Sequence, residues 1–285
     1  MNISGRTKVV GLFGYPVEHS FSPAMHNAAF ERLKLDYCYV TFPVHPDGLG
    51  DAVKAVRALS LGGVNVTVPH KENVIPFLDE VSEEASFIGA VNTIRNDNGR
   101  LTGYNTDGRG FMQSLAEAGI NAAGTKVLIA GAGGASRAVG YYLCKEAARV
   151  YIYDVDTPKA ESLVRHLNAL KGNALQADSG SVKSRDFFQG LDIIINATPL
   201  GLKSGDPVPV DTSLLSNKHI VCDLIYKETP LLGEASGIGC KTLDGLGMLL
   251  WQGIFAFEIW TGKMPPAGVM RDVLVRSRQT AGGSK

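Results

Sequence analysis

Residues Thr125 to Leu143 read TKVLIAGAGGASRAVGYYL and decide the predicted fold. The apolar run Val127–Ala130 predicts a short buried strand, the glycines after it predict a tight turn, and small residues then open a helix. Glycine lets the backbone approach a pyrophosphate, and the N–H groups at a helix start favour negative charge. The match to G-x-G-x-x-G is incomplete, because Ser136 occupies the third glycine position.

A second apolar segment follows this turn and strengthens the interpretation. Arg149–Tyr153 predicts a strand that ends at Asp154, roughly 20 residues after the glycines, where an acid can bind the adenosine ribose. Strand, turn, helix and acid in this order favour nucleotide binding over a purely structural turn, and we expect a nicotinamide dinucleotide.

Further strands and helices alternate along the same region. Pro158–Leu170 predicts a helix, and Asp192–Ala197 and Ile220–Leu224 predict two more strands. The alternation indicates a parallel, doubly wound α/β sheet with right-handed crossovers. The turn after Asp192–Ala197, within NATPLGL, is expected to form a wall of the nicotinamide pocket.

Composition narrows the class of partner. The 285 residues carry 28 Lys plus Arg and 28 Asp plus Glu, so the chain has no positive net charge that would favour binding to nucleic acid or to an anionic membrane. We therefore expect the partner to be a small molecule. No apolar run has the length of a signal peptide core or a membrane span, so we expect a cytoplasmic protein. The cysteines are far apart and are expected to be reduced core residues, with neither a disulfide framework nor a metal site: Cys38, Cys144, Cys222 and Cys240.

The N-terminal region begins with a predicted strand, Lys8–Gly14, and a helix that starts at Ser22-Pro23. Ser20 and Ser22 are expected in the loop just before this helix. Their hydroxyls, together with the helical N–H groups, could bind a carboxylate; alternatively, one serine simply caps the helix.

A second strand is predicted at Tyr37–Pro43, an amphipathic helix at Pro46–Leu59, and a third strand at Val64–Val68. Pro69 ends the third strand, which places Lys71 at its carboxyl end, where ligands collect in α/β sheets. A lone lysine is otherwise an ordinary solvated charge.

The following segment predicts a helix at Glu80–Ile88, a strand at Ala90–Arg95 and a helix from about Arg109 to Ala118. Asp107 precedes the last of these helices. It could act only as the helix cap or have a role in a site.

Near the C-terminus, DGLGMLLWQGIFAFEIWTGKMPP predicts an almost wholly apolar helix that contains Gln252. A buried amide needs partners, which neighbouring backbone or a polar ligand can supply. The last six residues, TAGGSK, are expected to be disordered.

Seven segments, taken together, resemble the shikimate dehydrogenase family over nearly the whole chain, and they occur in the family's order. They are GYPVEHSFSPAMHN, NVTVPHK, AVNT, GYNTDG, GAGGASRA, NATPLGL and DGLGMLLWQ. The resemblance implies reversible, NAD(P)-dependent reduction of 3-dehydroshikimate to shikimate in aromatic amino-acid biosynthesis. It also favours functional roles over purely structural ones for four residues: Ser20, Ser22, Lys71 and Asp107.

Matched position by position, the resemblance implies the site residues. Lys71 and Asp107 are the catalytic pair, with Lys71 as the main acid/base. The substrate carboxylate is held by Ser20 and Ser22, helped by Tyr226. The ring hydroxyls form hydrogen bonds with Thr67, Asn92, Asp107 and Gln252. The cofactor-binding residues are Gly131, Gly133, Gly134, Ala135, Asp154, Thr198, Gly245 and Met248.

The order of these motifs implies two domains. Residues 1–107 and 246–285 form a substrate-binding α/β domain, and residues 108–245 form an inserted Rossmann-type dinucleotide-binding domain. The active site is expected in the cleft between them, in a monomer or a homodimer.

One departure from the family bears on the cofactor. NADP-preferring members have Asn-Arg-Thr after the second strand of the nucleotide domain, whereas this chain has Asp154-Val155-Asp156. Two carboxylates favour the ribose hydroxyls of NAD and repel the additional phosphate of NADP, so we expect NAD to be preferred. Alternatively, Asp156 caps the next helix and Asp154 acts alone.

Two other functions stay open at this stage. NAD-using relatives include quinate/shikimate dehydrogenases, and the segment DVDTPKA resembles theirs, although Ser22 favours shikimate because quinate use goes with threonine there. A regulatory protein that senses nucleotides on the same scaffold is the second alternative, but it has little reason to retain Lys71 and Asp107.

Overall fold

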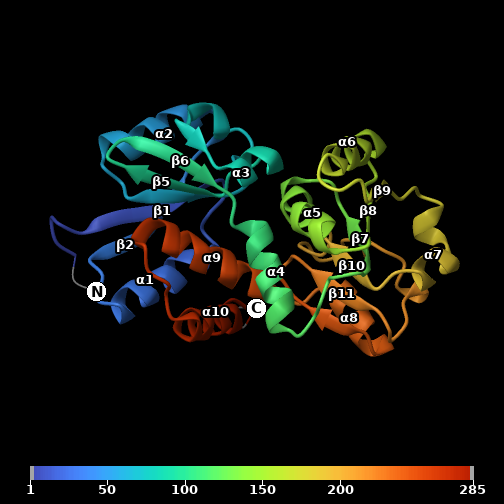
Figure 1. Cartoon of the computed structure of the whole chain (residues 1–285). Helices are drawn as coiled ribbons and strands as arrows, with labels where there is room; N and C mark the ends of the chain where they lie inside the picture. The colour runs from blue at the N-terminus through green and yellow to red at the C-terminus, as the bar shows by residue number, and fades with distance from the viewer. Residues whose placement is uncertain (1–2, 283–285) are drawn as a thin grey trace. The chain divides into compact units, whose positions relative to one another are not determined.

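The chain folds into two compact units, Met1–Thr106 with Leu250–Lys285, and Asp107–Leu249. The computed structural model describes residues 3–282. Each unit is built on its own six-stranded sheet with helices on both faces (Figure 1).

The sheet of the first unit has the strand order β2-β1-β3-β5-β6-β4. Its strands are β1 (Lys8–Gly14), β2 (Tyr37–Pro43), β3 (Gly63–Val66), β4 (Glu80–Val81), β5 (Thr93–Asp97) and β6 (Arg100–Tyr104). β1 pairs in parallel with β2 and β3, whereas β5 is antiparallel to both β3 and β6. The carboxyl ends of β1, β3 and β6 and the start of β5 therefore lie at the same edge.

Helices cover both faces of this sheet. They are α1 (Ser22–Arg32), α2 (Leu49–Ala58), α3 (Glu83–Ile88), α9 (Leu246–Thr261) and α10 (Ala267–Gly282), with short 3₁₀ turns at Pro46–Gly48 and Ile75–Phe77. In Figure 1, α2 lies over one face, and α1, α9 and α10 lie over the other. Val53 and Val56 of α2 belong to the same fully buried core as Val64 and Ile94 of the sheet.

Several predicted segments differ from the structure; the strand expected at Ala90–Arg95, for example, is Thr93–Asp97. Glu80 and Val81 are not helical but pair with Thr102 and Gly103 of β6, and the helix begins only after Ser82, whose side chain accepts a hydrogen bond from Ala85 N. Residues 46–48 form a 3₁₀ turn before α2. The expected disorder is wrong for residues 280–282, which end α10, and residues 283–285 lie outside the described part.

The second unit has a fully parallel sheet with the strand order β12-β11-β10-β7-β8-β9. Its strands are β7 (Lys126–Ala130), β8 (Arg149–Tyr153), β9 (Ala174–Gln176), β10 (Ile193–Asn196), β11 (Ile220–Asp223) and β12 (Lys241–Leu243). The order reverses between β7 and β10, which is the doubly wound arrangement predicted from the sequence.

Helices again lie on both faces of this sheet. They are α4 (Asp107–Glu117), α5 (Gly134–Glu146), α6 (Thr157–Asn168), α7 (Arg185–Gln189) and α8 (Pro230–Ile238), with 3₁₀ turns at Ser181–Lys183 and Thr212–Leu214. α4 and α5 approach closely at Gly108, which has no side chain. A Cβ atom on Gly108 would lie only 2.2 Å from the carbonyl oxygen of Ala138. Only glycine fits at this crossing.

The four cysteines are free and buried, as expected. Among residues 3–282, no helix has both the length and the apolar character needed to cross a membrane.

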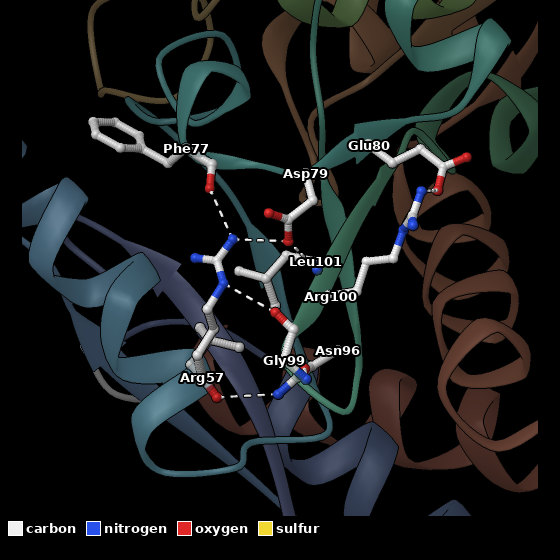
Figure 2. A network of polar contacts seen from close by, with 9 residues as sticks. Arg57, Phe77, Asp79, Glu80, Asn96, Gly99, Arg100 and Leu101 are labelled. Atoms are coloured by element: carbon white, nitrogen blue, oxygen red, sulfur yellow. Dashed lines mark hydrogen bonds and ion pairs between the residues drawn. The ribbon is translucent and has the colours of Figure 1, made fainter.

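A polar network ties α2 to the β5–β6 hairpin of the first unit (Figure 2). Arg57 donates from Nε to Gly99 O at 3.0 Å and from Nη2 to Asp79 Oδ2 at 2.8 Å. The same carboxylate accepts a hydrogen bond from Leu101 N at 2.7 Å. The backbone hydrogen bond from Leu101, and then the Arg57 guanidinium, lower the pKa of the Asp79 carboxyl.

The lowered pKa predicts a pH-dependent contribution to stability. A carboxyl that ionises more readily in the folded state stabilises the fold above its ordinary pKa of about 3.9, and this contribution is lost as the pH falls through the lower folded value. Asp79→Asn should therefore lower the free energy of unfolding at pH 6, and the difference from the wild type should shrink below about pH 3.9. Urea unfolding at several pH values measures this. Asp51 is exposed, so Asp51→Asn is the matched control and should have the wild-type free energy of unfolding. A loss of unfolding free energy in Asp79→Asn that is the same at every pH would contradict the lowered pKa of Asp79.

Candidate active site

Two loops meet at the carboxyl ends of β1 and β3. Thr67 N donates to Phe13 O at 2.9 Å, and Tyr15 N donates to Val68 O at 3.0 Å. The Thr67 methyl group packs directly against Gly14. A Cβ atom on Gly14 would lie 2.4 Å from that methyl carbon, so a side chain at position 14 would clash with Thr67. The loop that leads to Ser20 and Ser22 is therefore fixed beside the loop that carries Thr67 and Lys71.

The two serines have different positions at the start of α1. Ser20 Oγ accepts a hydrogen bond from Ser22 N at 3.3 Å, while the capping position itself is Phe21, with no side-chain capping bond. Ser22 is the first helical residue and is buried. Neither serine makes the usual cap to the second or third helical N–H.

Lys71 and Asn92 lie at the same edge of the sheet. Val91 N donates to Lys71 O at 2.8 Å, and Val66 N donates to Asn92 O at 2.8 Å. These backbone bonds hold the segment after β3 against the residues that precede β5. The Lys71 side chain is partly exposed, and Asn92 is buried.

The Asn92 side chain links β5 to the segment after β6. Its Oδ1 accepts from Thr106 N at 2.8 Å, and its Nδ2 donates to Thr106 Oγ1 at 2.9 Å. Thr106 Oγ1 in turn donates to the backbone oxygen of Gln252 at 3.0 Å, which brings α9 to the same place. Six predicted residues thus lie on the loops and helices along this edge of the first unit: Ser20, Ser22, Thr67, Lys71, Asn92 and Gln252.

The sequence predicted no role for four buried polar residues near this edge, which are Tyr39, Asn65, Thr93 and Thr106. In the structure they form hydrogen bonds with one another or with the predicted residues. A usable signal was present for Asn65. It is the one polar residue within β3, whose sequence is GVNV, and every residue of that strand is buried. A buried amide in an apolar strand requires partners.

Asp107 is the first residue of the second unit and of α4, directly after Thr106. The predicted start of this helix near Arg109 is two residues too late. Asp107 is buried.

The glycine-rich turn of the second unit lies between the carboxyl ends of β7 and β10. Gly131 has a φ of +105°, and a Cβ atom there would lie 2.8 Å from Ala197 O and 3.2 Å from the Thr198 methyl carbon. Glycine is therefore required for both backbone conformation and close approach. At Gly133 the space is open, because a Cβ there has no neighbour within 4 Å.

Asp154 follows β8 and is fixed against this turn. Its Oδ2 accepts from Ala132 N at 2.8 Å, and its Oδ1 accepts from Asp156 N at 2.9 Å. Each carboxylate oxygen keeps further lone pairs with which to accept hydroxyl donors. Asp156 instead caps α6, because its Oδ1 accepts from Lys159 N at 3.1 Å.

The remaining predicted residues lie on loops of the same unit, except Met248, which lies in the first turn of α9. Thr198 Oγ1 donates to Asn196 Oδ1 at 2.6 Å after β10, and Gly245 N donates to Ile225 O at 3.0 Å. Met248 is buried, whereas Tyr226 is 38% exposed, and partial desolvation raises the pKa of its phenol.

These features fit a dinucleotide. The turn after β7 has an open position at Gly133, α5 begins beside it at Gly134 with Ala135 next, and a carboxylate stands at the end of β8. A pyrophosphate is favoured at such a helix start, and a ribose diol is favoured at such a carboxylate. Within residues 3–282, no group of three or more His, Cys, Asp or Glu side chains is placed to hold a metal ion.

Comparison with known proteins identifies the family. The family model of the shikimate dehydrogenase substrate binding domain matches residues 12–94, and that of the shikimate 5'-dehydrogenase C-terminal domain matches residues 245–275. A shikimate dehydrogenase (NADP(+)) of Desulforamulus reducens is 50% identical over 279 residues, which cover 95% of this chain and 96% of the relative. This chain belongs to the shikimate dehydrogenase family.

Solved structures of the family agree with this fold. Shikimate 5-dehydrogenase of Listeria monocytogenes in complex with shikimate and NAD is 39% identical, with a TM-score of 0.89 over 96% of this chain and 98% of that chain. Quinate dehydrogenase of Corynebacterium glutamicum in complex with NAD is 33% identical, with a TM-score of 0.88 over 95% of this chain and 99% of that chain. The predicted family and fold class are thus confirmed.

The two glycines of the turn after β7 give a matched test of the dinucleotide site. Gly133→Ala should leave the melting temperature near that of the wild type, because its side chain enters open space, but should weaken dinucleotide binding several-fold by obstructing the phosphate. Gly131→Ala should lower the melting temperature, because the residue has a positive φ and would contact Ala197. Thermal unfolding and fluorescence titration with the reduced dinucleotide measure the two effects. Unimpaired binding by a folded Gly133→Ala protein would contradict the assignment.

Proposed function

We propose that this chain catalyses the reversible, NAD(P)-dependent reduction of 3-dehydroshikimate to shikimate, a step of aromatic amino-acid biosynthesis. One observation carries the proposal: two serines, a lysine and a buried amide lie on neighbouring loops and helices at one edge of the first unit's sheet, in a chain that also has a doubly wound dinucleotide-binding unit. Support comes from relatives that are named shikimate dehydrogenases.

The proposed roles follow the chemistry of the side chains. Ser20 and Ser22, helped by Tyr226, bind the carboxylate of the substrate through their hydroxyls. Hydroxyls and amides can each donate or accept, which suits the ring hydroxyl groups. We assign that role to Thr67, Asn92, Asp107 and Gln252.

Reduction of the ketone requires a hydride and a proton. The nicotinamide dinucleotide, when bound, supplies the hydride. Lys71 donates the proton to the developing alkoxide, and in the reverse direction it accepts the proton of the reacting hydroxyl. Asp107 orients Lys71 and that hydroxyl.

In the second unit, the turn residues Gly131, Gly133, Gly134 and Ala135 are proposed to contact the pyrophosphate. Thr198, Gly245 and Met248 are proposed to border the nicotinamide. The expected cytoplasmic location and the expected monomer or homodimer remain predictions.

Steady-state oxidation of shikimate and of quinate, followed by the absorbance of the reduced nicotinamide, tests the proposed function. Shikimate should be the better substrate, because Ser22 stands where quinate users have threonine; the methyl difference discriminates only modestly, so some quinate turnover is compatible. Lys71→Met should lower kcat by about 100-fold or more with little change in the KM of shikimate, since it removes the proton donor.

Lys54→Met, an exposed lysine of α2, is the matched control and should turn over shikimate as the wild type does. Near wild-type turnover by Lys71→Met would refute the role of Lys71. A clear preference for quinate would favour a catabolic quinate/shikimate dehydrogenase, and no turnover of either substrate would favour a nucleotide-sensing protein.

We further infer that NAD is preferred over NADP, although the relative of 50% identity is named for NADP(+). The supporting observation is Asp154, whose carboxylate is fixed beside the turn after β7 by Ala132 N and Asp156 N. A negative charge there accepts hydrogen bonds from a ribose diol and repels a phosphate. Asp156 caps α6, which supports the alternative in which Asp154 acts alone.

Two charge-neutralising variants test this inference. Asp154→Asn should raise the ratio of kcat/KM for NADP to that for NAD by roughly tenfold, because it removes a like-charge repulsion of order 1 kcal/mol. Asp156→Asn should change the ratio much less, and asparagine is an equally good helix cap, so the fold should be unaffected. Comparable efficiency of the wild type with NADP and NAD would contradict the preference.

A further inference from the structure

The last residues of β10 and β11, Asn196 and Asp223, are paired neighbours at the carboxyl edge of the second unit's sheet. Both are buried, and Asn196 Nδ2 donates to Asp223 Oδ1 at 3.0 Å. Burying a carboxylate is costly unless its oxygens have partners, and ligands bind at this edge of a doubly wound sheet. The pair therefore stands where a buried charge can serve a bound ligand.

The Asn196 amide shapes the turn that follows β10. Its Oδ1 accepts from Thr198 N at 3.0 Å and from Thr198 Oγ1 at 2.6 Å. Its Nδ2 donates to Leu200 O at 3.1 Å as well as to Asp223. Two accepted and two donated bonds use the full capacity of an amide. The position of Thr198 thus depends on the orientation of this one side chain.

Asp223 sets that orientation. An ionised carboxylate only accepts hydrogen bonds, so the NH₂ end of Asn196 must face it, which directs the amide oxygen to Thr198. Asp223 Oδ1 also accepts from Ile225 N at 3.0 Å, and Oδ2 accepts from Thr229 Oγ1 at 2.8 Å. Burial raises the pKa of this carboxyl, and the three hydrogen bonds oppose that rise.

The bonds of Asp223 join the loop after β10 to the loop after β11. These loops also pack together, because a Cβ atom on Gly201 would lie 3.2 Å from the Thr229 methyl carbon. The loop after β12 is joined to them by Gly245 N, which donates to Ile225 O at 3.0 Å. The three loops carry residues assigned above to the ligands: Thr198, Tyr226 and Gly245.

We propose that Asp223 is a positioning residue, which through the Asn196 amide holds the Thr198 turn against the nicotinamide ring of the bound dinucleotide. This inference rests on the proposed function, in which that turn borders the ring. Asp223 contacts no atom of the dinucleotide or the substrate. It contributes acceptor oxygens in a defined geometry rather than its charge.

Asp223→Leu removes the acceptors and nearly keeps the volume, so the Asn196 amide is free to turn. A misplacement of about 1 Å in a reacting group can cost roughly 100-fold in rate. The kcat for shikimate oxidation should therefore fall about tenfold or more, and the Kd of NADH should rise about fivefold.

Asp223→Asn should rescue the activity to within about threefold of the wild-type kcat. Its side-chain oxygen can accept from Asn196 Nδ2 and Ile225 N, and its NH₂ group can donate to the Thr229 hydroxyl. Asp223→Asn as impaired as Asp223→Leu would overturn the inference, because the charge and not the acceptor geometry would then be essential.

Binding of ADP-ribose, which lacks the nicotinamide, separates positioning from a general loss of structure. Its Kd, measured by calorimetry beside that of NADH, should be within about twofold of the wild-type value in Asp223→Leu. The turn after β7 and Asp154, which would bind this fragment, have no hydrogen bond to Asp223. Equal losses of affinity for ADP-ribose and NADH would overturn the inference.

His219 provides the matched control, because it is buried directly before the same strand, β11, at the opposite edge of the sheet. Its Nδ1 accepts from Ser216 N at 2.9 Å, and its Nε2 lies 2.9 Å from Phe188 O. His219→Ala should lower the melting temperature but keep kcat within about twofold of the wild type. A tenfold loss of kcat in this variant would attribute the effect to stability and overturn the inference.

Thr229→Val gives the test a second variant if Asp223→Leu does not fold. It removes only the bond to Asp223 Oδ2 and keeps the methyl group beside Gly201. Its kcat should fall about threefold with no change in the Kd of ADP-ribose.

An unchanged kcat and NADH affinity in folded Asp223→Leu, or in Thr229→Val where Asp223→Leu does not fold, would overturn the inference while the proposed function stands. Failure of the wild type to oxidise shikimate would instead overturn the proposed function.

Discussion

The hydrogen bonds of the Asn92 amide are the constraint on which the first unit's functional edge depends. This one side chain joins the start of β5 to Thr106 after β6, and Thr106 joins both to α9 through Gln252 O. An amide buried this deeply costs roughly 1–3 kcal/mol for each polar group left without a partner. The folded arrangement is therefore favoured only when all three segments are in place, and those segments carry the residues proposed to bind the substrate.

In the second unit, the proposed site for the dinucleotide, an extended anion, is formed mainly by backbone groups rather than by side chains. Gly131 lets the chain turn against Ala197, Gly133 leaves space open, and Asp154 holds the turn by accepting from Ala132 N. Because the strand order reverses between β7 and β10, the loops after these strands diverge to opposite faces, which leaves room for a ligand at the sheet edge. The fold creates the site, and few side chains are needed.

The sequence predicted much of this architecture, because the signals were local. The strands Lys8–Gly14, Tyr37–Pro43 and Arg149–Tyr153 have the bounds expected from their apolar patterns, and the doubly wound order follows from alternating strands and helices. The prediction was wrong at Glu80–Val81, where pairing with a distant strand outweighs a locally helical pattern. The functional residues came mainly from motifs that resemble a family. The hydrogen bond between the Tyr39 phenol and Asn65 could not be predicted in the same way, since the two residues lie 26 positions apart along the chain.

The central claim is that the edge formed by β1, β3 and β5 binds shikimate with its carboxylate at the start of α1. A crystal structure of this protein with shikimate tests it most directly. The account predicts carboxylate oxygens within about 2.5–3.0 Å of the Ser20 and Ser22 hydroxyls, and a ring hydroxyl within hydrogen-bond distance of Asn92. A carboxylate bound away from both serines, or a ring with no contact to Asn92, would contradict it.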